Sequence, residues 1–217
     1  MLRRMKKTDD GSHTIYVPGL DEHYHSVNGA MTESEHIYTG AAFDYSDKES
    51  VRVLEYGMGT GLNVLLTYMR ATAGRRRVFY HAIEKYPLTK VELELLNLAE
   101  YSPEIFKKIH ESDWETEVQV SESFVLFKEC ADFREAAPTG LFDVIYYDAF
   151  APEVQPALWT AEMFSKVYEL AGPGAVLTTY SSRGQVRRNM KQAGFIVQKL
   201  PGPPGKREIV RATKPFI

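Results

Sequence analysis

The sequence predicts an α/β fold: a mostly parallel sheet of seven strands, with one antiparallel strand and helices on both faces. From Val51 onward, short apolar runs typical of buried strands alternate with segments whose apolar residues recur at helical spacing. The last two expected strands are joined by a loop rich in proline and glycine. This loop is too short to hold a crossover helix, so the pair should be antiparallel.

Each expected element rests on a local signal. The strands are short runs of β-branched, aromatic and other apolar residues: 51–56, 78–83, 124–127, 142–147, 175–180, 195–200 and 208–212. The helices have apolar residues three and four positions apart, and prolines open several of them: 61–71, 87–98, 103–110, 156–170 and 185–192. The run Gly172-Pro173-Gly174 ends the fourth helix.

The composition and the polar start of the chain define its organisation. Residues 1–50 are polar and weakly periodic, so we expect an N-terminal extension or lid packed on a core domain of residues 51–217.

The composition excludes several classes of protein. Hydrophobic residues make up 44% of the chain, which argues against disorder, and the single cysteine, Cys130, excludes a disulfide framework. No apolar run approaches the roughly 20 residues of a membrane span. The start MLRRMKKTDD also lacks the apolar core of a secretory signal, so we expect a cytoplasmic location and no membrane partner.

Charge is distributed unevenly along the chain, although the net charge is only −3. Residues 183–217 hold nine Lys and Arg and one acid, a net of +8, whereas residues 1–182 hold 17 basic and 28 acidic groups, a net of −11. A basic segment on an acidic body suits a polyanionic partner, and a solvated basic surface is the alternative. The candidate contacts are Arg183, Arg187, Arg188, Lys206 and Arg207.

A glycine motif lies between the first strand and the first helix. Gly57, Gly59 and Gly61 allow a tight turn and close approach of a ligand to the main chain. Their spacing differs from the G-x-G-x-x-G of dinucleotide-binding proteins, which disfavours an NAD-dependent dehydrogenase. Because Glu55 precedes them, a ligand with an ammonium group suits the motif better than a pyrophosphate. S-adenosylmethionine has such a group, and a generic strand–helix turn is the alternative.

Acidic residues follow three further strands at the carboxyl edge, where open α/β sheets bind ligands. Glu84 could accept hydrogen bonds from two ribose hydroxyls, and Asp132 from an adenine amino group; an ion pair and a helix cap are the alternatives. Asp148, in the run DAFAP, could hold an ammonium group and take its proton. Phe150 could stack on a base. A helix cap and a core position are the alternatives for these two. The spacing of the N-terminal histidines matches no metal site, so no metal is expected.

Four segments together resemble the methyltransferase domain of the MnmC family: 53–63, 80–85, 148–152 with Leu158-Trp159, and 201–207. The resemblance spans residues 22 to 213, and the run Tyr24-His25-Ser26 is similar to that of the stand-alone members, called MnmD. It implies a Rossmann-like class I fold and S-adenosyl-L-methionine as cofactor. The implied reaction is N-methylation of 5-aminomethyl-(2-thio)uridine at the wobble position in the tRNA anticodon loop. It also implies no FAD-dependent domain in this chain.

The same resemblance implies roles for individual residues. Asp148 would hold the target amine and act as its base. The cofactor would be bound by Glu55, Gly57, Gly59, Gly61, Asn63, Glu84 and Asp132. The tRNA would be received by Phe150, Arg183, Arg187, Arg188, Lys206 and Arg207.

Two other functions remain open on the sequence. A spermidine-synthase-like aminopropyltransferase also uses an adenosylsulfonium ligand, but it predicts an acidic pocket and no basic face. A non-catalytic RNA-binding module that holds S-adenosylmethionine predicts binding without turnover, and the presence of Asp148 argues against it.

Overall fold

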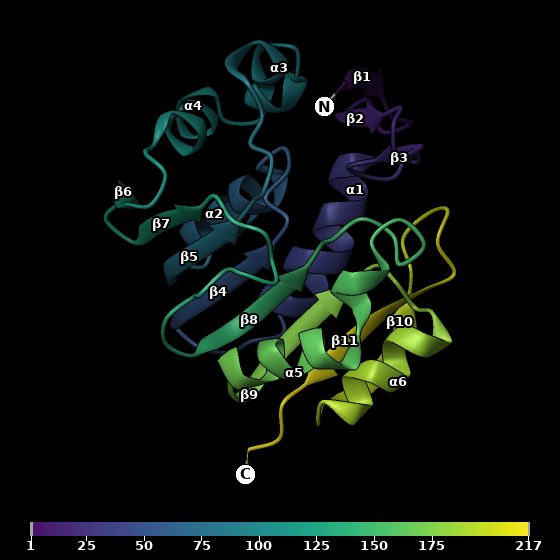
Figure 1. The fold of residues 1–217 in the computed structure, drawn as a ribbon. Helices are drawn as coiled ribbons and strands as arrows, with labels where there is room; N and C mark the ends of the chain where they lie inside the picture. The colour runs from purple at the N-terminus through teal and green to yellow at the C-terminus, as the bar shows by residue number, and fades with distance from the viewer. Residues whose placement is uncertain (1, 217) are drawn as a thin grey trace.

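The computed structural model describes residues 2–216, which form an eight-stranded sheet covered by helices and a three-stranded sheet from the N-terminal segment (Figure 1). The strand order of the large sheet is β10-β11-β9-β8-β4-β5-β7-β6. Its strands are β4 (Ser50–Tyr56), β5 (Arg77–Ile83), β6 (Glu117–Ser121), β7 (Phe124–Glu129), β8 (Phe142–Tyr147), β9 (Ala171–Thr179), β10 (Ile196–Pro201) and β11 (Glu208–Thr213).

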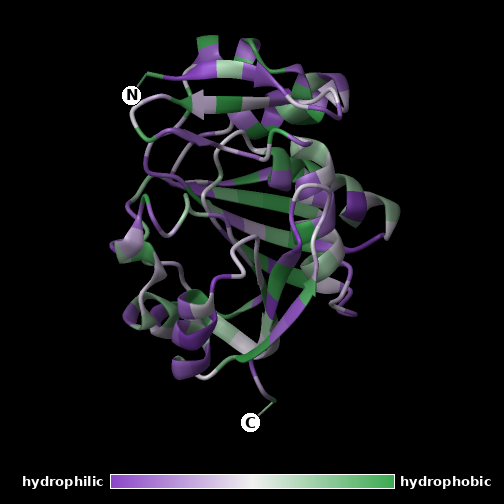
Figure 2. Cartoon of the chain, turned by 90° about the vertical axis from the view of Figure 1, so that its right-hand side faces the viewer, coloured by the Kyte–Doolittle hydropathy of each residue, from purple (hydrophilic) through white to green (hydrophobic). Residues whose placement is uncertain are grey.

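The helices divide between the two faces of this sheet, and each face has its own apolar core. Strand β4 shows the division: Val53 belongs to one core, and Leu54 and Tyr56 to the other, because successive side chains of a strand point to opposite faces. Figure 2 shows apolar residues running along the central strands. The first core takes in α2 (Leu62–Ala73) and α4 (Pro103–Glu111), and the second takes in α5 (Ala161–Leu170) and α6 (Gly184–Gln192).

The predicted mostly parallel sheet and the antiparallel final pair are confirmed. Strands β10 and β11 pair antiparallel, whereas β8, β4, β5 and β7 are parallel neighbours. The predicted count of seven strands is wrong, since β6 adds an eighth strand antiparallel to β7. Only Val120 of β6 is buried, because the strand lies at an edge of the sheet. β6 therefore lacks the apolar run from which a strand could be predicted.

Two predicted helices are shorter than expected. The segment 87–98 contains only α3 (Lys90–Glu94), followed by a 3₁₀ turn, η2 (Asn97–Glu100). The segment 156–170 begins with a 3₁₀ turn, η3 (Pro156–Trp159), and continues as α5. The break falls at Thr160, whose side chain accepts a hydrogen bond from the backbone N–H of Met163 and so caps α5.

The N-terminal segment holds a small antiparallel sheet and a continuous helix. The sheet comprises β1 (Arg4–Lys7), β2 (His13–Val17) and β3 (Glu22–His23). The helix begins as α1 (Ala30–Ser34) and continues as a π-helix, η1 (Glu35–Phe43), which packs on α2, β8 and β9. The sequence did not predict this helix, because Thr32, Ser34 and Gly40 interrupt its apolar pattern. The domain division at residue 50 stays a prediction.

Among residues 2–216, no helix has the length and the apolar character of a membrane span.

Candidate active site

The carboxyl ends of β4, β5 and β8 open into a cavity of about 620 Å³, a volume typical of small-molecule sites. Residues 22–27 of the N-terminal segment line it together with the sheet edge. Three basic side chains, Lys85, Arg134 and Lys206, reach the cavity wall. Its five carboxylates outnumber them, so the cavity favours a cationic ligand: Glu22, Glu33, Glu84, Asp132 and Asp148.

The glycine loop, residues 57–61, lines the cavity in part and is also closely packed against neighbouring elements. Gly57 has a φ of +100°, and a Cβ there would lie 2.5 Å from the carbonyl oxygen of Asp148. Gly61, directly before α2, has a φ of +72°, and a Cβ there would lie 2.9 Å from the His110 ring. Gly57 and Gly59 line the cavity, whereas Gly61 packs away from it. The motif therefore forms part of the cavity wall and also allows the close contact between the ends of β4 and β8.

Glu84 and Asp132 both line the cavity, but their carboxylates have different partners. Glu84 accepts hydrogen bonds from the backbone N–H groups of Gly59 at 3.0 Å and Tyr86 at 2.8 Å, and keeps lone pairs for a ligand. Asp132 accepts from the Arg134 guanidinium at 2.9 Å and pairs with Lys85 at 2.9 Å. Arg134 and Lys85 hold the pKa of Asp132 well below its usual range. Asp132 is thus an ion-paired carboxylate beside the cavity.

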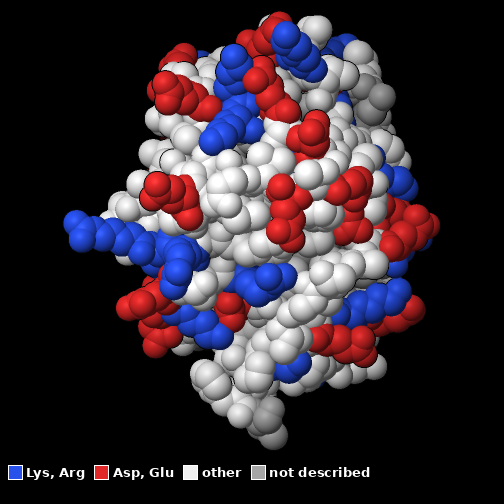
Figure 3. Space-filling view, turned by 90° about the vertical axis from the view of Figure 1, so that its left-hand side faces the viewer, with Lys and Arg blue, Asp and Glu red and all other residues white. Residues whose placement is uncertain are grey.

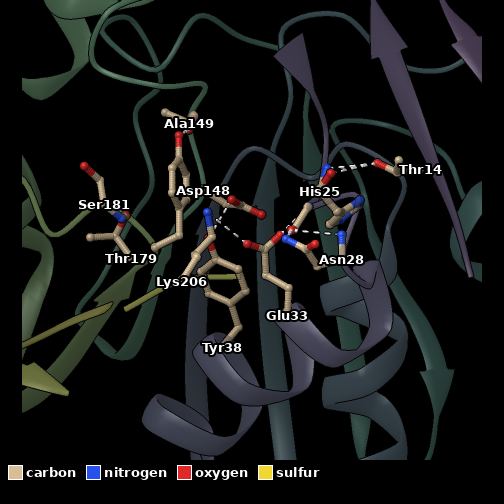
Figure 4. A network of polar contacts seen from close by, with 12 residues as sticks. Thr14, His25, Asn28, Glu33, Tyr38, Asp148, Ala149, Thr179, Ser181 and Lys206 are labelled. Carbon is tan, nitrogen blue, oxygen red and sulfur yellow. Dashed lines mark hydrogen bonds and ion pairs between the residues drawn. The ribbon is translucent and has the colours of Figure 1, made fainter. Parts of the chain in front are cut away.

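Asp148 lies deep in the cavity, directly after β8 (Figure 4). Its Oδ1 accepts a hydrogen bond from the Tyr38 hydroxyl at 2.5 Å, and its Oδ2 accepts one from the Asn63 side chain at 3.2 Å. Burial raises the pKa of Asp148 to about 7, and the charge of Glu33 adds to this, while both hydrogen bonds and Lys206 oppose it. A carboxyl group in this state can gain and lose a proton near neutral pH.

Glu55 and Asn63 lie beneath the cavity and do not line it. Glu55 is fully buried and accepts hydrogen bonds from Asn63 at 2.8 Å and from the Tyr80 hydroxyl at 2.9 Å. Burial raises the pKa of Glu55 well above its usual range, although these hydrogen bonds lower it. Asn63 therefore joins Glu55 to Asp148 and fixes the orientation of the Asp148 carboxylate.

Lys206 reaches into the cavity from the loop between β10 and β11 (Figure 4). Its ammonium group lies 3.3 Å from Oε1 of Glu33 and 4.8 Å from the centre of the Tyr180 ring. Tyr180 donates a hydrogen bond to the carbonyl of Ala149 at 2.8 Å, which holds its ring beside Asp148. The sequence placed Lys206 among contacts to tRNA, and the structure places it inside the cavity.

The other predicted substrate contacts divide between the cavity and the outside. Phe150 lines the cavity and packs edge-on against Tyr24, with ring centres 5.4 Å apart. Arg183 pairs with Glu153, and Arg207 is exposed. On α6, the half-buried Arg187 donates to the carbonyl of Ser182, and the exposed Arg188 donates to the side chain of Gln185. These four arginines do not line the cavity.

Sequence reasoning missed four side chains of this region as site residues: Tyr24, Glu33, Tyr38 and Tyr180. Tyr24 and Glu33 belong to the N-terminal run that carries part of the resemblance. Tyr38 and Tyr180 have no local signal, since each reaches the site only when distant segments pack together. Among the described residues, no three His, Cys, Asp or Glu side chains are grouped to hold a metal ion.

A family model described as "S-adenosyl-L-methionine-dependent methyltransferase" matches residues 94–215, more than half of the chain. The chain belongs to this methyltransferase family. The predicted dependence on S-adenosyl-L-methionine is therefore confirmed. The cavity fits such a cofactor, because its volume suits a nucleoside and its excess of carboxylates suits a sulfonium with an ammonium group.

Curated relatives carry the name "tRNA 5-methylaminomethyl-2-thiouridine biosynthesis bifunctional protein MnmC". The Cupriavidus metallidurans protein is 30% identical over 94% of this chain and 33% of its own length. The Stutzerimonas stutzeri protein is 31% identical over 87% of this chain and 31% of its own length. The resemblance to the MnmC methyltransferase domain is confirmed, and the chain spans about a third of these relatives.

Solved structures share the fold. MNMC2 from Aquifex aeolicus superposes with a TM-score of 0.78 at 23% identity, covering 100% of this chain and 73% of that one. Spermidine synthase from Thermotoga maritima gives a TM-score of 0.60 at 14% identity, with the same coverage of 100% and 73%. The predicted Rossmann-like class I fold is confirmed by these likenesses.

Proposed function

We propose that this methyltransferase methylates the primary amine of 5-aminomethyl-(2-thio)uridine at the tRNA wobble position, giving the 5-methylaminomethyl form. The observation that carries the proposal is Asp148, a deeply set carboxylate with a pKa of about 7 at the cavity end of β8. The name of the relatives, which includes 5-methylaminomethyl-2-thiouridine, supports the choice of nucleoside. A tRNA substrate also implies a cytoplasmic enzyme.

The reaction needs an amine that has lost a proton, because a protonated amine has no lone pair to attack with. S-adenosyl-L-methionine supplies an activated methyl group on a sulfonium. Asp148 would hold the substrate ammonium and accept its proton, and its raised pKa makes it a stronger base than an ordinary aspartate. Tyr38 and Asn63 would keep the carboxylate aimed at the amine.

The cofactor would lie along the sheet edge between the glycine loop and the N-terminal segment. Gly57 and Gly59 would let it approach the main chain, and Glu84 would accept hydrogen bonds from its ribose. Asp132, paired with two cations, would face the adenine. Glu55, Gly61 and Asn63 would act from beneath, by holding the loop and Asp148 in place.

The tRNA would enter past Phe150, whose ring lies in the cavity wall and could stack on the wobble base. Arg183, Arg187, Arg188 and Arg207 would contact the phosphate backbone outside the cavity. A wobble base lies in a single-stranded loop, so it can be turned out of the stack and reach Asp148.

The test uses tRNA from cells that lack this protein, incubated with the purified protein and S-adenosyl-L-methionine. Nucleoside mass spectrometry should show conversion of 5-aminomethyl-2-thiouridine to its 5-methylaminomethyl form. Asp148→Asn should lower the rate by a factor of about 10² to 10⁴ while cofactor affinity stays within about threefold. Asp113→Asn, an exposed aspartate outside the cavity, is the matched control. Full activity in Asp148→Asn would remove this residue from the mechanism.

An aminopropyltransferase is the second candidate, because the cavity is rich in carboxylates and the fold is shared with a spermidine synthase. Decarboxylated S-adenosylmethionine with putrescine tests it. Spermidine as the product, with no change in tRNA nucleosides, would favour this second activity over the first.

A further inference from the structure

The Lys206 ammonium group lies among anionic and aromatic groups from different elements (Figure 4). It pairs with Glu33 of α1 at 3.3 Å and lies 4.8 Å from the centre of the Tyr180 ring. It is also close enough to Asp148 for its charge to act on that carboxylate. A carboxylate pair with an aromatic face is the environment that proteins use to bind an organic ammonium.

The groups around this ammonium are held in place by other contacts. Oε2 of Glu33, a buried residue, accepts a hydrogen bond from the backbone N–H of Ser26 at 2.6 Å. Asp148 is held by Tyr38, and the Tyr180 hydroxyl is tied to the carbonyl of Ala149. We call Glu33, Asp148 and Tyr180 the cage. Each of the three side chains is held by a contact with a residue other than Lys206, so the shape of the cage does not depend on Lys206.

Lys206 itself is held less firmly than the cage. Its side chain is 28% exposed and is attached to the loop between β10 and β11. Partly exposed ion pairs and cation–π contacts are modest in strength. Just before this loop, the carbonyl oxygen of Pro201, the last residue of β10, lies 2.8 Å from Nε2 of His36. A shift of this loop would remove Lys206 from the cage without disturbing the sheet.

We propose that Glu33, Asp148 and Tyr180 form a binding site for a primary alkylammonium group, which Lys206 occupies in the free protein. An incoming amine of the same chemistry displaces Lys206, and the β10–β11 loop moves with it. The site is inferred from the contacts that the Lys206 ammonium group makes and does not require the proposed function. Its use by the aminomethyl group of a nucleoside rests on the proposed function. In that case Lys206 excludes substrates that lack an amine, since only a cation replaces it without leaving carboxylates unpaired.

The experiment shortens the Lys206 side chain to Cβ and supplies a primary alkylammonium as a free molecule. n-Butylammonium is the probe, because it carries the same ammonium group on an unbranched stem of four carbons, the length of the lysine side chain. Its binding to the full chain is followed by amide NMR shifts in the wild type and in Lys206→Ala. Lys206→Ala should bind n-butylammonium at least tenfold more tightly than the wild type does, and n-butanol should bind to neither. Lys199→Ala, which removes an exposed lysine of the same hairpin, should behave like the wild type.

Two further variants locate the binding and guard against misfolding. Glu33→Gln in the Lys206→Ala background should lose most of the gained affinity, because one carboxylate of the cage is gone. If Lys206→Ala does not fold, the titration is repeated with Lys206→Gln, which keeps part of the aliphatic side chain against Tyr180. Equal affinity for n-butylammonium in wild type and Lys206 variants would overturn the site, as would tight binding of n-butanol.

The outcomes for the site and for the proposed function are separable. Binding of n-butylammonium without methylation of tRNA would retain the ammonium site and reject the tRNA reaction. Methylation of tRNA with no gain of amine binding in Lys206→Ala would reject the site and retain the reaction. A loss of tRNA affinity in Lys206→Ala with no change for n-butylammonium would make Lys206 a phosphate contact instead.

Discussion

The hydroxyl of Tyr38 donates a 2.5 Å hydrogen bond to the carboxylate of Asp148, although 110 residues separate them in the chain. Tyr38 belongs to the N-terminal π-helix η1, and Asp148 follows β8 at the sheet edge. The N-terminal segment is therefore part of the site, because it supplies a donor to the group that we propose as the base.

Tyr38→Phe removes this donor and should raise the pKa of Asp148 above about 7. A hydrogen bond donated to a carboxylate favours the charged form, and one of moderate strength is worth about one pH unit. The acid limb of the pH profile of kcat/KM should move up by about one unit, with activity about fivefold lower at pH 7 and nearly unchanged at pH 9. Tyr146→Phe, a buried tyrosine bonded to Thr67, is the control. An unmoved acid limb in Tyr38→Phe would contradict the assignment.

Gly57→Ala should destabilise the fold and disturb the position of Asp148. The φ of +100° disfavours any residue with a Cβ, and this Cβ would lie 2.5 Å from the carbonyl oxygen of Asp148. We expect a loss of about 2–4 kcal/mol in the free energy of unfolding, measured in urea, together with weaker cofactor binding by calorimetry. Gly19→Ala has open space around its Cβ and should cost far less. Equal stability of the two variants would show that the β4–β8 contact relaxes easily.

Asp10 should make the N-terminal segment sensitive to acid. Although burial raises its pKa, hydrogen bonds from Ser12, Thr32 and Thr8 dominate and hold the pKa well below the usual range. The stability it adds is therefore present above its unfolded pKa of about 3.9 and is lost as pH falls below that value. Asp10→Asn should lower the free energy of unfolding by about 1 kcal/mol at pH 7, a figure that allows for its exposure.

The same comparison at low pH completes this prediction. The stability difference between wild type and Asp10→Asn should shrink steadily as pH falls from about 4 to 2, because the unfolded chain takes up a proton at Asp10 there while the folded carboxylate stays ionised. Asp9→Asn, next to it and exposed, should change little at either pH. A constant difference between Asp10→Asn and wild type from pH 7 to pH 2 would argue against the charge as the cause.

Reversing Arg187 and Arg188 to Glu should weaken tRNA binding and reduce its dependence on salt. If each contacts one phosphate, the slope of log affinity against log salt should fall by about 2 in magnitude. The control reverses Lys90 of α3 and Lys107 of α4. Figure 3 shows the side of the molecule that is on the left in Figure 1, and positive and negative groups are interspersed on it. Equal losses in both double variants would indicate a general charge effect and reject a basic face on α6.

Most strands of the large sheet could be predicted from local sequence patterns. Apolar runs predicted β4, β5, β7, β8, β9 and β11, because strands with buried side chains are rich in apolar residues. They also predicted β10, although this edge strand has no buried residue. The edge strand β6 escaped, since only Val120 is buried, and so did the helix from Ala30 to Phe43, whose apolar pattern is interrupted. Asp148 could be predicted from its motif and its place after a buried strand. Its partners Tyr38 and Lys206 could not, because their contacts join segments far apart in the chain.

Local sequence patterns are enough to predict the parallel sheet, the glycine loop and the acids at the carboxyl edge of the sheet, because periodicity and backbone freedom act over a few neighbouring residues. The protonation and pairing of those acids depend instead on the packing of distant segments. Asp132 is neutralised by Lys85 and Arg134, Glu55 is sealed beneath the cavity, and Asp148 is left with a pKa near neutrality. The physical reason is that solvation and charge pairing depend on what surrounds a carboxylate in space.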